Sequence, residues 1–296
     1  MSDITIIGLG KMGTALAEAL LKGQRRLSVW NRNSARCNAL AAKGADVAAT
    51  IVAAVQASDV VILSLSDYRA MDAVLRRDEV IPNLRGKTII QLSSGTPREA
   101  RDAAVWMEQA RATYLDGAIL GYPVHIGTSH ATILVSGSRD GFDRNQGLLQ
   151  LFGAVRYLGG NPGAASALDC AALTSSMLKI VGLVHGIAVC ESESVDPSEL
   201  VALLNAQLPM WGNLNRAIME SIRDRAFSNP QASLDTWAAI PKHLAQISSD
   251  NSLSQAVPSM LLTIFEQAQR RGLGDADIAS IVEVIGAGGR KPGDPG

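Results

Sequence analysis

Three glycines between an apolar run and a helical pattern constrain this chain more than any other feature. The run Ile4–Ile7 has the apolar, β-branched character of a buried strand, and a helical pattern follows the glycines from Ala15 onward. A Gly-x-Gly-x-x-Gly sequence in this strand–turn–helix context is typical of dinucleotide-binding domains. The first glycine permits the tight turn, the second leaves room for a pyrophosphate, and the third lets helix and strand approach closely. We therefore expect the following residues to contact a dinucleotide: Gly8, Leu9, Gly10, Lys11, Met12 and Gly13.

The residues after the second predicted strand, Leu27–Trp30, indicate which dinucleotide is bound. NAD-specific domains place Asp or Glu here to accept a hydrogen bond from the ribose 2′-hydroxyl, but this chain has Asn31-Arg32-Asn33. Arg32, with Arg36 one helical turn later, offers cationic groups to a 2′-phosphate that a carboxylate would repel. The pattern favours NADP(H) over NAD(H). Solvated surface arginines are the alternative interpretation.

Further candidates lie where two later strands end, because ligands of such sheets bind outside the carboxyl ends of the strands. Ser64-Leu65-Ser66 ends one strand, and Ser93-Ser94 ends another, so we expect both to line the path of the ribose and nicotinamide. A structural role is equally compatible with Ser93 and Ser94. The sequence from Thr96 to Glu99 is a capping box with proline at the first helical position, which makes Thr96 structural.

Short β-rich runs alternate with amphipathic stretches as far as about residue 160, a pattern typical of βαβ units on a largely parallel sheet. The expected strands are Ile4–Ile7, Leu27–Trp30, Val60–Leu65, Thr88–Leu92, Thr113–Leu115, Ala131–Val135 and Val155–Leu158. We therefore predict an α/β fold with an N-terminal, Rossmann-type doubly wound sheet over residues 1–160.

Chain breakers are concentrated in Gly159–Gly163, and beyond them strand signals nearly vanish. Residues 161–194 are expected to form a long interdomain helix, because Ala164–Ser192 is apolar on almost all sides and must be buried between domains or subunits. Residues 195–288 are expected to form an all-α dimerisation domain, with helices broken at Pro209, Asn229-Pro230 and Gly272–Gly274. The glycine- and proline-rich residues 289–296 are expected to be a disordered tail.

Composition excludes several classes of partner. Lys plus Arg number 27 against 28 for Asp plus Glu, and no basic block interrupts the chain, so nucleic acid and anionic membrane surfaces are not expected as partners. The longest continuous apolar stretch, Ile180–Cys190, is about half the ~20 residues that span a bilayer, which favours a buried helix.

The cysteines and histidines predict neither a disulfide framework nor a metal site. The chain has an odd number of cysteines without CxxC spacing: Cys37, Cys170 and Cys190. The histidines show no ligand spacing with Cys, Asp or Glu. The chain begins without a basic leader or hydrophobic signal core. We expect a cytoplasmic protein with reduced thiols and no metal.

Taken together, the motifs resemble the NADPH-dependent imine reductases and reductive aminases, relatives of the β-hydroxyacid dehydrogenases. Besides the glycine loop and the Val29–Arg32 strand end, the resemblance rests on separated motifs in the right order over nearly the whole chain. They are Leu92–Pro97, Tyr114–Ile119, Tyr157–Gly159, Gly163–Asp169, Asp235–Trp237 and Gly272–Ile278.

The resemblance implies a catalytic position early on the interdomain helix, which is Asp169 here. Hydroxyacid dehydrogenases carry a lysine there, whereas many imine reductases carry an aspartate and others a tyrosine. Lys179 lies ten residues too late to be that lysine, and Leu120–Tyr122 replaces the serine-glycine-glycine substrate motif of the dehydrogenases. The resemblance therefore implies an imine substrate, with hydride added to the C=N carbon.

The chemistry of Asp169 agrees with this implication. Hydride transfer is fastest to a protonated iminium, which a nearby carboxylate stabilises and to which it can relay a proton. The alternative is that Asp169 only complements the positive end of its helix, although it lies in the second turn, where that effect fades. Related reductive aminases carry a tyrosine two turns after the aspartate, where this chain has Met177, so reduction of preformed imines is the safer expectation.

The substrate pocket is expected to include Tyr122, Leu173, Met177, Met210, Trp211 and Trp237, although buried core is the favoured reading of Trp237. By resemblance the protein is a homodimer in which the helical domain of one chain completes the site of the other, serving secondary metabolism. Two alternatives remain at this point: an NADP-dependent β-hydroxyacid-type dehydrogenase, and a non-catalytic NADP-binding regulatory protein.

Overall fold

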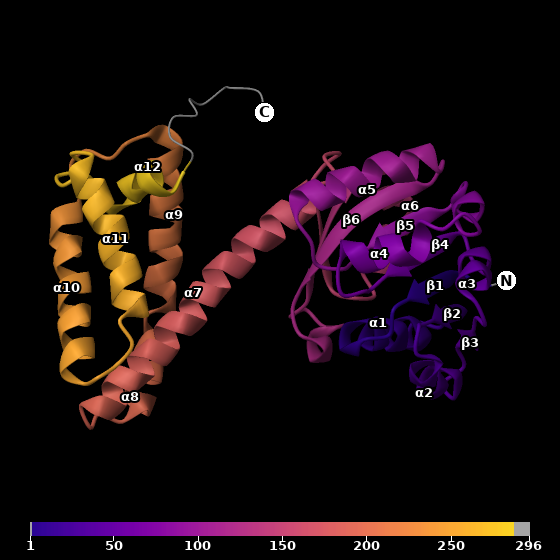
Figure 1. Cartoon of the computed structure of the whole chain (residues 1–296), viewed down its shortest axis with the longest axis horizontal. Coiled ribbons are helices and arrows are strands. Elements are labelled where there is room, and N and C mark those ends of the chain that lie inside the picture. Colours follow the sequence, from indigo (N-terminus) through magenta and orange to yellow (C-terminus); the bar gives the residue numbers. More distant parts are fainter. Residues whose placement is uncertain (1, 287–296) are drawn as a thin grey trace. The chain divides into compact units, whose positions relative to one another are not determined.

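The computed structural model describes residues 2–286, and the chain divides into two compact units, Met1–Ser175 and Ser176–Gly296. The first unit combines strands and helices, and the described part of the second is helical (Figure 1). The α/β class predicted from the sequence is confirmed. The predicted tail, residues 289–296, lies outside the described residues.

Within the described residues the first unit forms an eight-stranded sheet in the order β3-β2-β1-β4-β5-β6-β7-β8. Every neighbouring pair is parallel except β6 and β7, which are antiparallel. The order reverses between β1 and β4, and this is the point at which doubly wound sheets bind ligands. The strands are β1 Ile4–Ile7, β2 Leu27–Trp30, β3 Asp46–Val47, β4 Val60–Leu63, β5 Thr88–Gln91, β6 Thr113–Leu120, β7 Thr132–Gly137 and β8 Ala154–Tyr157.

Two strands differ most from the sequence-based expectation, whereas the ends of the others differ from it by at most two residues. β3 was not predicted, because two exposed residues at a sheet edge carry no periodic signal. The strand expected over Thr113–Leu115 continues to Leu120 and pairs with β7. Gly117 lies inside it because a Cβ at this position would come 2.8 Å from the carbonyl oxygen of Leu134. A close backbone approach, and not a break in the strand, explains that glycine.

Helices cover both faces of the sheet, as parallel strands require. One hydrophobic core joins the sheet to α1 and α6, and a second joins it to α3, α4 and α5. Neighbouring strand residues such as Ile62 and Leu63 therefore enter opposite cores. The helices of this unit are α1 Lys11–Lys22, α2 Asn38–Ala41, α3 Ile51–Gln56, α4 Tyr68–Leu75, α5 Pro97–Gln109 and α6 Arg139–Leu149, with 3₁₀ turns η1 Ser34–Cys37, η2 Ile81–Leu84 and η3 Pro123–His125.

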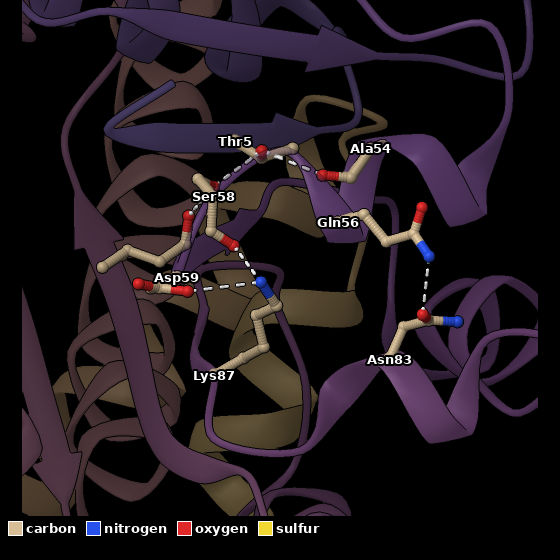
Figure 2. A network of polar contacts seen from close by, with 8 residues as sticks. Thr5, Ala54, Gln56, Ser58, Asp59, Asn83 and Lys87 are labelled. Carbon is tan, nitrogen blue, oxygen red and sulfur yellow. Dashed lines mark hydrogen bonds and ion pairs between the residues drawn. The ribbon is translucent and has the colours of Figure 1, made fainter. Parts of the chain in front are cut away.

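A polar network ties together the amino ends of the central strands (Figure 2). The hydroxyl of Thr5 donates to the carbonyl oxygen of Ala54 at 3.0 Å and lies 2.8 Å from the hydroxyl of Ser58. The ammonium group of Lys87 donates to the carbonyl oxygen of Ser58 at 2.7 Å. Because β1, β4 and β5 are joined at this edge, the loops at their opposite, carboxyl ends start from fixed positions.

The long predicted helix is α7, Ala164–Ser192. Only Ala165, Ser166 and Asp169 are buried along it, and its most apolar 18-residue window contains no buried residue. Its length and its mean hydropathy of 1.6 over that window are sufficient to cross a membrane. The same two criteria are met by core helices of soluble proteins, so they identify no membrane span.

The helical unit contains α8 Pro197–Ala206, α9 Leu208–Asp224, α10 Leu234–Asp250, α11 Ala256–Arg270, a 3₁₀ turn η4 Ile278–Ile281 and α12 Val282–Ile285. Pro209 stands in the first turn of α9, so the predicted break after α8 is confirmed. A small core joins Leu234 and Ala238 of α10 to Phe265 and Ala268 of α11, and Trp237 packs against it. This contact agrees with the structural reading of Trp237.

Two motifs that carried the resemblance meet in this unit. A Cβ on Gly274 would lie 2.6 Å from a carboxylate oxygen of Asp235, and the amide of Asp235 donates to the carbonyl oxygen of Gly274 at 3.0 Å. The side chain of Gln269 also donates to Asp235 at 2.6 Å. These residues therefore join the start of α10 to the segment after α11.

Candidate functional site

The glycine loop has the geometry of a phosphate-binding turn. Gly8 has φ +99°, and a Cβ there would lie 2.3 Å from the carbonyl oxygen of Ser64. A Cβ on Gly13 would lie 2.0 Å from the carbonyl oxygen of Gly8, whereas a Cβ on Gly10 would meet no atom within 4 Å. The fold itself therefore requires glycine at the first and third positions, while the second faces open space next to the start of α1.

The start of α1 fits an anionic group. Gly10 precedes α1, whose N-terminus receives no side-chain cap, and Lys11 begins the helix. Backbone N–H groups and the helix dipole at such an end attract phosphate. Leu9 is buried in the core, so its contribution to a ligand is limited to the backbone, and Met12 is partly buried against the same core. These residues fit the pyrophosphate of a dinucleotide.

Three of the polar residues after β2 form hydrogen bonds that hold the surrounding loops in place. The side-chain oxygen of Asn31 accepts from the amide of Leu9 at 2.9 Å, and its side-chain NH₂ donates to the carbonyl oxygen of Asn33 at 2.9 Å. Asn33 in turn accepts from the amide of Ala35 and caps η1. Arg36 donates to the carbonyl oxygen of Leu9 at 3.4 Å. Asn31 and Arg36 thus fix the glycine loop.

Arg32 differs from its neighbours. Its side chain is exposed, and none of the described residues forms a hydrogen bond or ion pair with it. It lines a cavity of about 620 Å³ together with Trp30, Ser34, Thr50, Arg77 and Glu79. Sites for small molecules have volumes in this range. Arg77 and Glu79 follow α4 and lie outside every sequence motif, so they were not among the predicted site residues.

The two serine loops meet at the ends of the adjacent strands β4 and β5. The hydroxyl of Ser93 accepts from the amide of Leu65 at 2.8 Å, and the amide of Ser93 donates to the side chain of Gln91 at 3.2 Å. Ser64 and Ser93 are buried, whereas Ser66 and Ser94 are exposed. Ser93 therefore has a structural bond, and the exposed serines are the ones free to contact a ligand.

The expected capping box at the start of α5 is confirmed. The hydroxyl of Thr96 accepts from the amide of Glu99, and the carboxylate of Glu99 accepts from the amide of Thr96 at 2.8 Å. The Thr96 hydroxyl and the Glu99 carboxylate therefore both cap the amino end of α5. Thr96 is structural.

Asp169 is buried in the second turn of α7 with only 6% of its surface exposed. Burial raises the pKa of its carboxyl group, because the charged form loses hydration. Among residues 2–286 no side chain or backbone amide forms a hydrogen bond with this carboxyl group. A buried carboxyl group without a donor is costly in a purely structural position.

A second buried carboxyl group, Asp116, was not among the predicted site residues. It lies in β6 with no exposed surface, and it accepts hydrogen bonds from the hydroxyl of Tyr68 and from the amide and hydroxyl of Ser166, the latter two at 3.2 and 2.8 Å. Burial, reinforced by the negative charge of Asp169, raises the pKa of Asp116 to about 6. An acidic residue inside an otherwise apolar strand was the available sequence signal.

The predicted substrate-pocket residues lie in both units. In the first unit Tyr122 follows β6 and is 69% exposed, with its ring edge-on to His125 at 5.7 Å, and Leu173 of α7 is exposed. In the second unit Met177, Met210 and Trp211 are exposed. These apolar side chains are available to a ligand or a second chain, and their role in a substrate pocket stays a prediction.

No group of three or more His, Cys, Asp or Glu side chains within residues 2–286 is arranged to hold a metal ion. The described cysteines, Cys37, Cys170 and Cys190, are free thiols.

Comparison with known families adds to this geometry. Residues 3–160 match the model of the NAD binding domain of 6-phosphogluconate dehydrogenase. Residues 161–287 match the model of the C-terminal domain of NADPH-dependent reductive aminase-like proteins. The two matches meet between residues 160 and 161, next to the start of α7.

Individual relatives cover nearly the whole chain. An NADPH-dependent reductive aminase from Aspergillus oryzae is 32% identical over 289 residues, which are 96% of this chain and 97% of the relative. The structure of an imine reductase from Myxococcus stipitatus in complex with NADP⁺ is 31% identical with a TM-score of 0.91, covering 96% of this chain and 99% of that one. A reductive aminase from Aspergillus terreus in complex with NADPH4, cyclohexanone and allyl amine is 34% identical with a TM-score of 0.89 and the same coverage.

Proposed function

Because the chain belongs to the NADPH-dependent imine reductase and reductive aminase family, we propose that it reduces a small, cyclic imine or iminium by hydride transfer to the C=N carbon. It is an NADP-dependent oxidoreductase that acts on C=N bonds. Beyond family membership, the proposal specifies that the substrate is cyclic. It also assigns Asp169 as the group that stabilises or protonates the substrate nitrogen.

The chain's own residues supply binding and orientation. The loop from Gly8 to Gly13 and the start of α1 hold the pyrophosphate, and Arg32, at the cavity after β2, binds the 2′-phosphate. Ser66 and Ser94 face the remaining length of the dinucleotide. When bound, NADPH supplies the hydride.

The observation that carries the assignment is the environment of Asp169. A carboxyl group that is mostly buried and forms no hydrogen bond within the described residues stabilises a cation better than one in water, because solvent screens the attraction less. Its raised pKa also allows it to hold a proton closer to neutral pH. An iminium nitrogen suits both properties. A lysine, as in the hydroxyacid dehydrogenases, would repel that cation.

A substrate panel tests the function. NADPH oxidation is followed with a pyrroline and a dihydroisoquinoline, and NADP⁺ reduction is followed with hydroxyisobutyrate. Turnover with the cyclic imines is expected. Turnover with the hydroxy acid alone would identify a β-hydroxyacid-type dehydrogenase. Tight NADPH binding without turnover on a broad imine panel would identify a non-catalytic regulatory protein.

The proposal includes a homodimer that is cytoplasmic, has no nucleic-acid or membrane partner and serves secondary metabolism. Exposed apolar side chains along α7, such as Leu178, Val181 and Val184, support an interface between two chains. The free thiols agree with a reducing compartment. Light scattering after gel filtration without detergent tests the assembly: a dimer mass is expected, and a monomer would contradict it.

A further inference from the structure

Tyr68 lies where the two predicted cofactor loops meet. It is the first residue of α4, close after the end of β4, and only 3% of its surface is exposed. A Cβ on Gly95, in the loop after β5, would lie 2.2 Å from the ring of Tyr68, so only glycine fits against the ring. The ring therefore supports the loop that also carries Ser94, the exposed serine expected to face the cofactor.

The hydroxyl of Tyr68 leads to a different element. It donates to one carboxylate oxygen of Asp116 on β6. The other carboxylate oxygen accepts from the amide of Ser166 at 3.2 Å and from its hydroxyl at 2.8 Å. Ser166 belongs to the first turn of α7, and the residue before this helix, Gly163, offers no side-chain oxygen as a cap. Asp116 therefore caps α7, and Tyr68 holds Asp116.

A second strand holds the same helix end. The hydroxyl of Ser136 accepts from the amide of Ala165 at 3.0 Å and donates to the carbonyl oxygen of Pro162 at 2.9 Å. Ser136 and Asp116 are directly opposite each other on β7 and β6. Of the two caps, the one formed by Asp116 continues through Tyr68 to a cofactor loop.

The capped turn of α7 leads directly to Asp169. This residue lies three positions after Ser166, so the two side chains lie on one face of the helix, and a shift of the first turn moves Asp169 with it. Hydride transfer requires reacting atoms about 3 to 3.5 Å apart, and a misplacement of about 1 Å costs about 100-fold in rate. The network thus connects the loop expected beside the cofactor to the helix that carries Asp169.

We propose that Tyr68 is a positioning residue, which sets the place of Asp169 relative to the cofactor loop. Its ring supports the loop after β5, and its hydroxyl, through Asp116, holds the first turn of α7. The proposal rests on the proposed role of Asp169 in imine reduction and adds the residue that positions it. In this account Tyr68 touches neither substrate nor cofactor. Because the network is buried and its members are hydrogen-bonded, it defines one geometry for both elements.

Two buried tyrosines in one cluster provide a test variant and its matched control. Tyr68→Phe removes the hydroxyl that donates to Asp116 and keeps the ring against Gly95. Tyr114→Phe also removes a buried hydroxyl, which lies 3.3 Å from that of Tyr68, but it leaves the bond from Tyr68 to Asp116 in place. Ser166→Ala removes the hydroxyl donor at the other end of the same link.

The first measurement is the single-turnover rate of hydride transfer to a cyclic imine by protein preloaded with NADPH, together with the Kd for NADPH. Tyr68→Phe is expected to lower the rate about tenfold and to leave the Kd within about twofold of wild type. Tyr114→Phe is expected to keep the wild-type rate within about twofold. An unchanged rate in Tyr68→Phe, or an equal loss in Tyr114→Phe, would overturn the proposal.

A double-mutant cycle tests whether Tyr68 and Ser166 act through one link. If both act through Asp116, the double variant of Tyr68→Phe and Ser166→Ala is no slower than the slower single variant, because the link is already broken. Multiplied losses of rate in the double variant would show independent effects and would overturn the proposal.

Hydrogen exchange of the amides at the start of α7 tests the link without any substrate. In the cofactor-free protein, Tyr68→Phe and Ser166→Ala should exchange faster there than the wild type, whereas Tyr114→Phe should exchange as the wild type does. Unchanged exchange in Tyr68→Phe would overturn the proposal. A wild-type rate of imine reduction in Asp169→Ala would instead show that the proposed role of Asp169 has failed, whatever the exchange result.

Discussion

Replacement of Arg32 by alanine tests the cofactor assignment without disturbing the fold. Among the described residues its side chain forms no hydrogen bond or ion pair, so the free protein loses no contact. Arg36 is unsuitable for the same test, because its guanidinium donates to the carbonyl oxygen of Leu9 and helps to fix the glycine loop.

The expected magnitude follows from the 2′-phosphate contact. A hydrogen bond to a charged group contributes about 1.5 to 3 kcal/mol. At about 1.4 kcal/mol for each tenfold change, Arg32→Ala should raise the Kd for NADPH about 10- to 100-fold. NADH lacks the phosphate, so its Kd should change less than about twofold. The preference for NADPH over NADH should fall by the same factor.

The assay is a fluorescence titration of both cofactors with Arg32→Ala, with Arg25→Ala as the matched control. Arg25 is an exposed arginine before the amino end of β2, whereas Arg32 follows its carboxyl end. The control should bind both cofactors as the wild type does. Equal weakening of NADPH and NADH by Arg32→Ala, or no weakening of NADPH, would show that Arg32 does not bind the 2′-phosphate.

Two further predictions concern the glycine loop and the buried carboxyl group. Gly10→Ala should leave the free energy of unfolding within about 1 kcal/mol of wild type and weaken NADPH binding, whereas Gly13→Ala should cost about 3 kcal/mol or more, because its Cβ meets the carbonyl oxygen of Gly8. Urea unfolding and an NADPH titration measure both effects, and equal stability of the two variants would contradict the assignment. For Asp116 the pKa of about 6 in the folded protein exceeds the ordinary 3.8, so its contribution to stability is present below pH 4 and is lost as pH rises through 6. Relative to Asp116→Asn, the wild-type free energy of unfolding should fall by on the order of 2 kcal/mol between pH 4 and pH 7, and parallel curves would contradict this.

The elements with strong local signals were predictable from the sequence. The glycine loop carries its own steric reason, because Gly8 and Gly13 are required by contacts with nearby backbone. The ends of α7 agree with the predicted Ala164–Ser192, because chain breakers precede the helix and a proline follows it. The capping box at Thr96 could likewise be predicted from the sequence, because its two residues lie three positions apart.

Contacts between distant parts of the chain were not predictable. Asp116 and Ser166 are 50 residues apart, and no local pattern indicates that one caps the helix of the other. Arg77 and Arg32 line one cavity although 45 residues separate them in the sequence, and no local pattern indicates this proximity. The side chain of Asn31 holds the glycine loop, and its contact with the cofactor stays a prediction. Its residue type is compatible with either role.

The proposed action of Asp169 on the nitrogen of a C=N substrate is best examined by single-turnover reduction of a cyclic iminium with Asp169→Ala preloaded with NADPH. The rate of hydride transfer should fall by about 100-fold or more, while the Kd for NADPH stays within about twofold of wild type. Cys170→Ala, a change at the next and exposed position of α7, serves as the control and should retain the wild-type rate. A wild-type rate in Asp169→Ala would contradict the account.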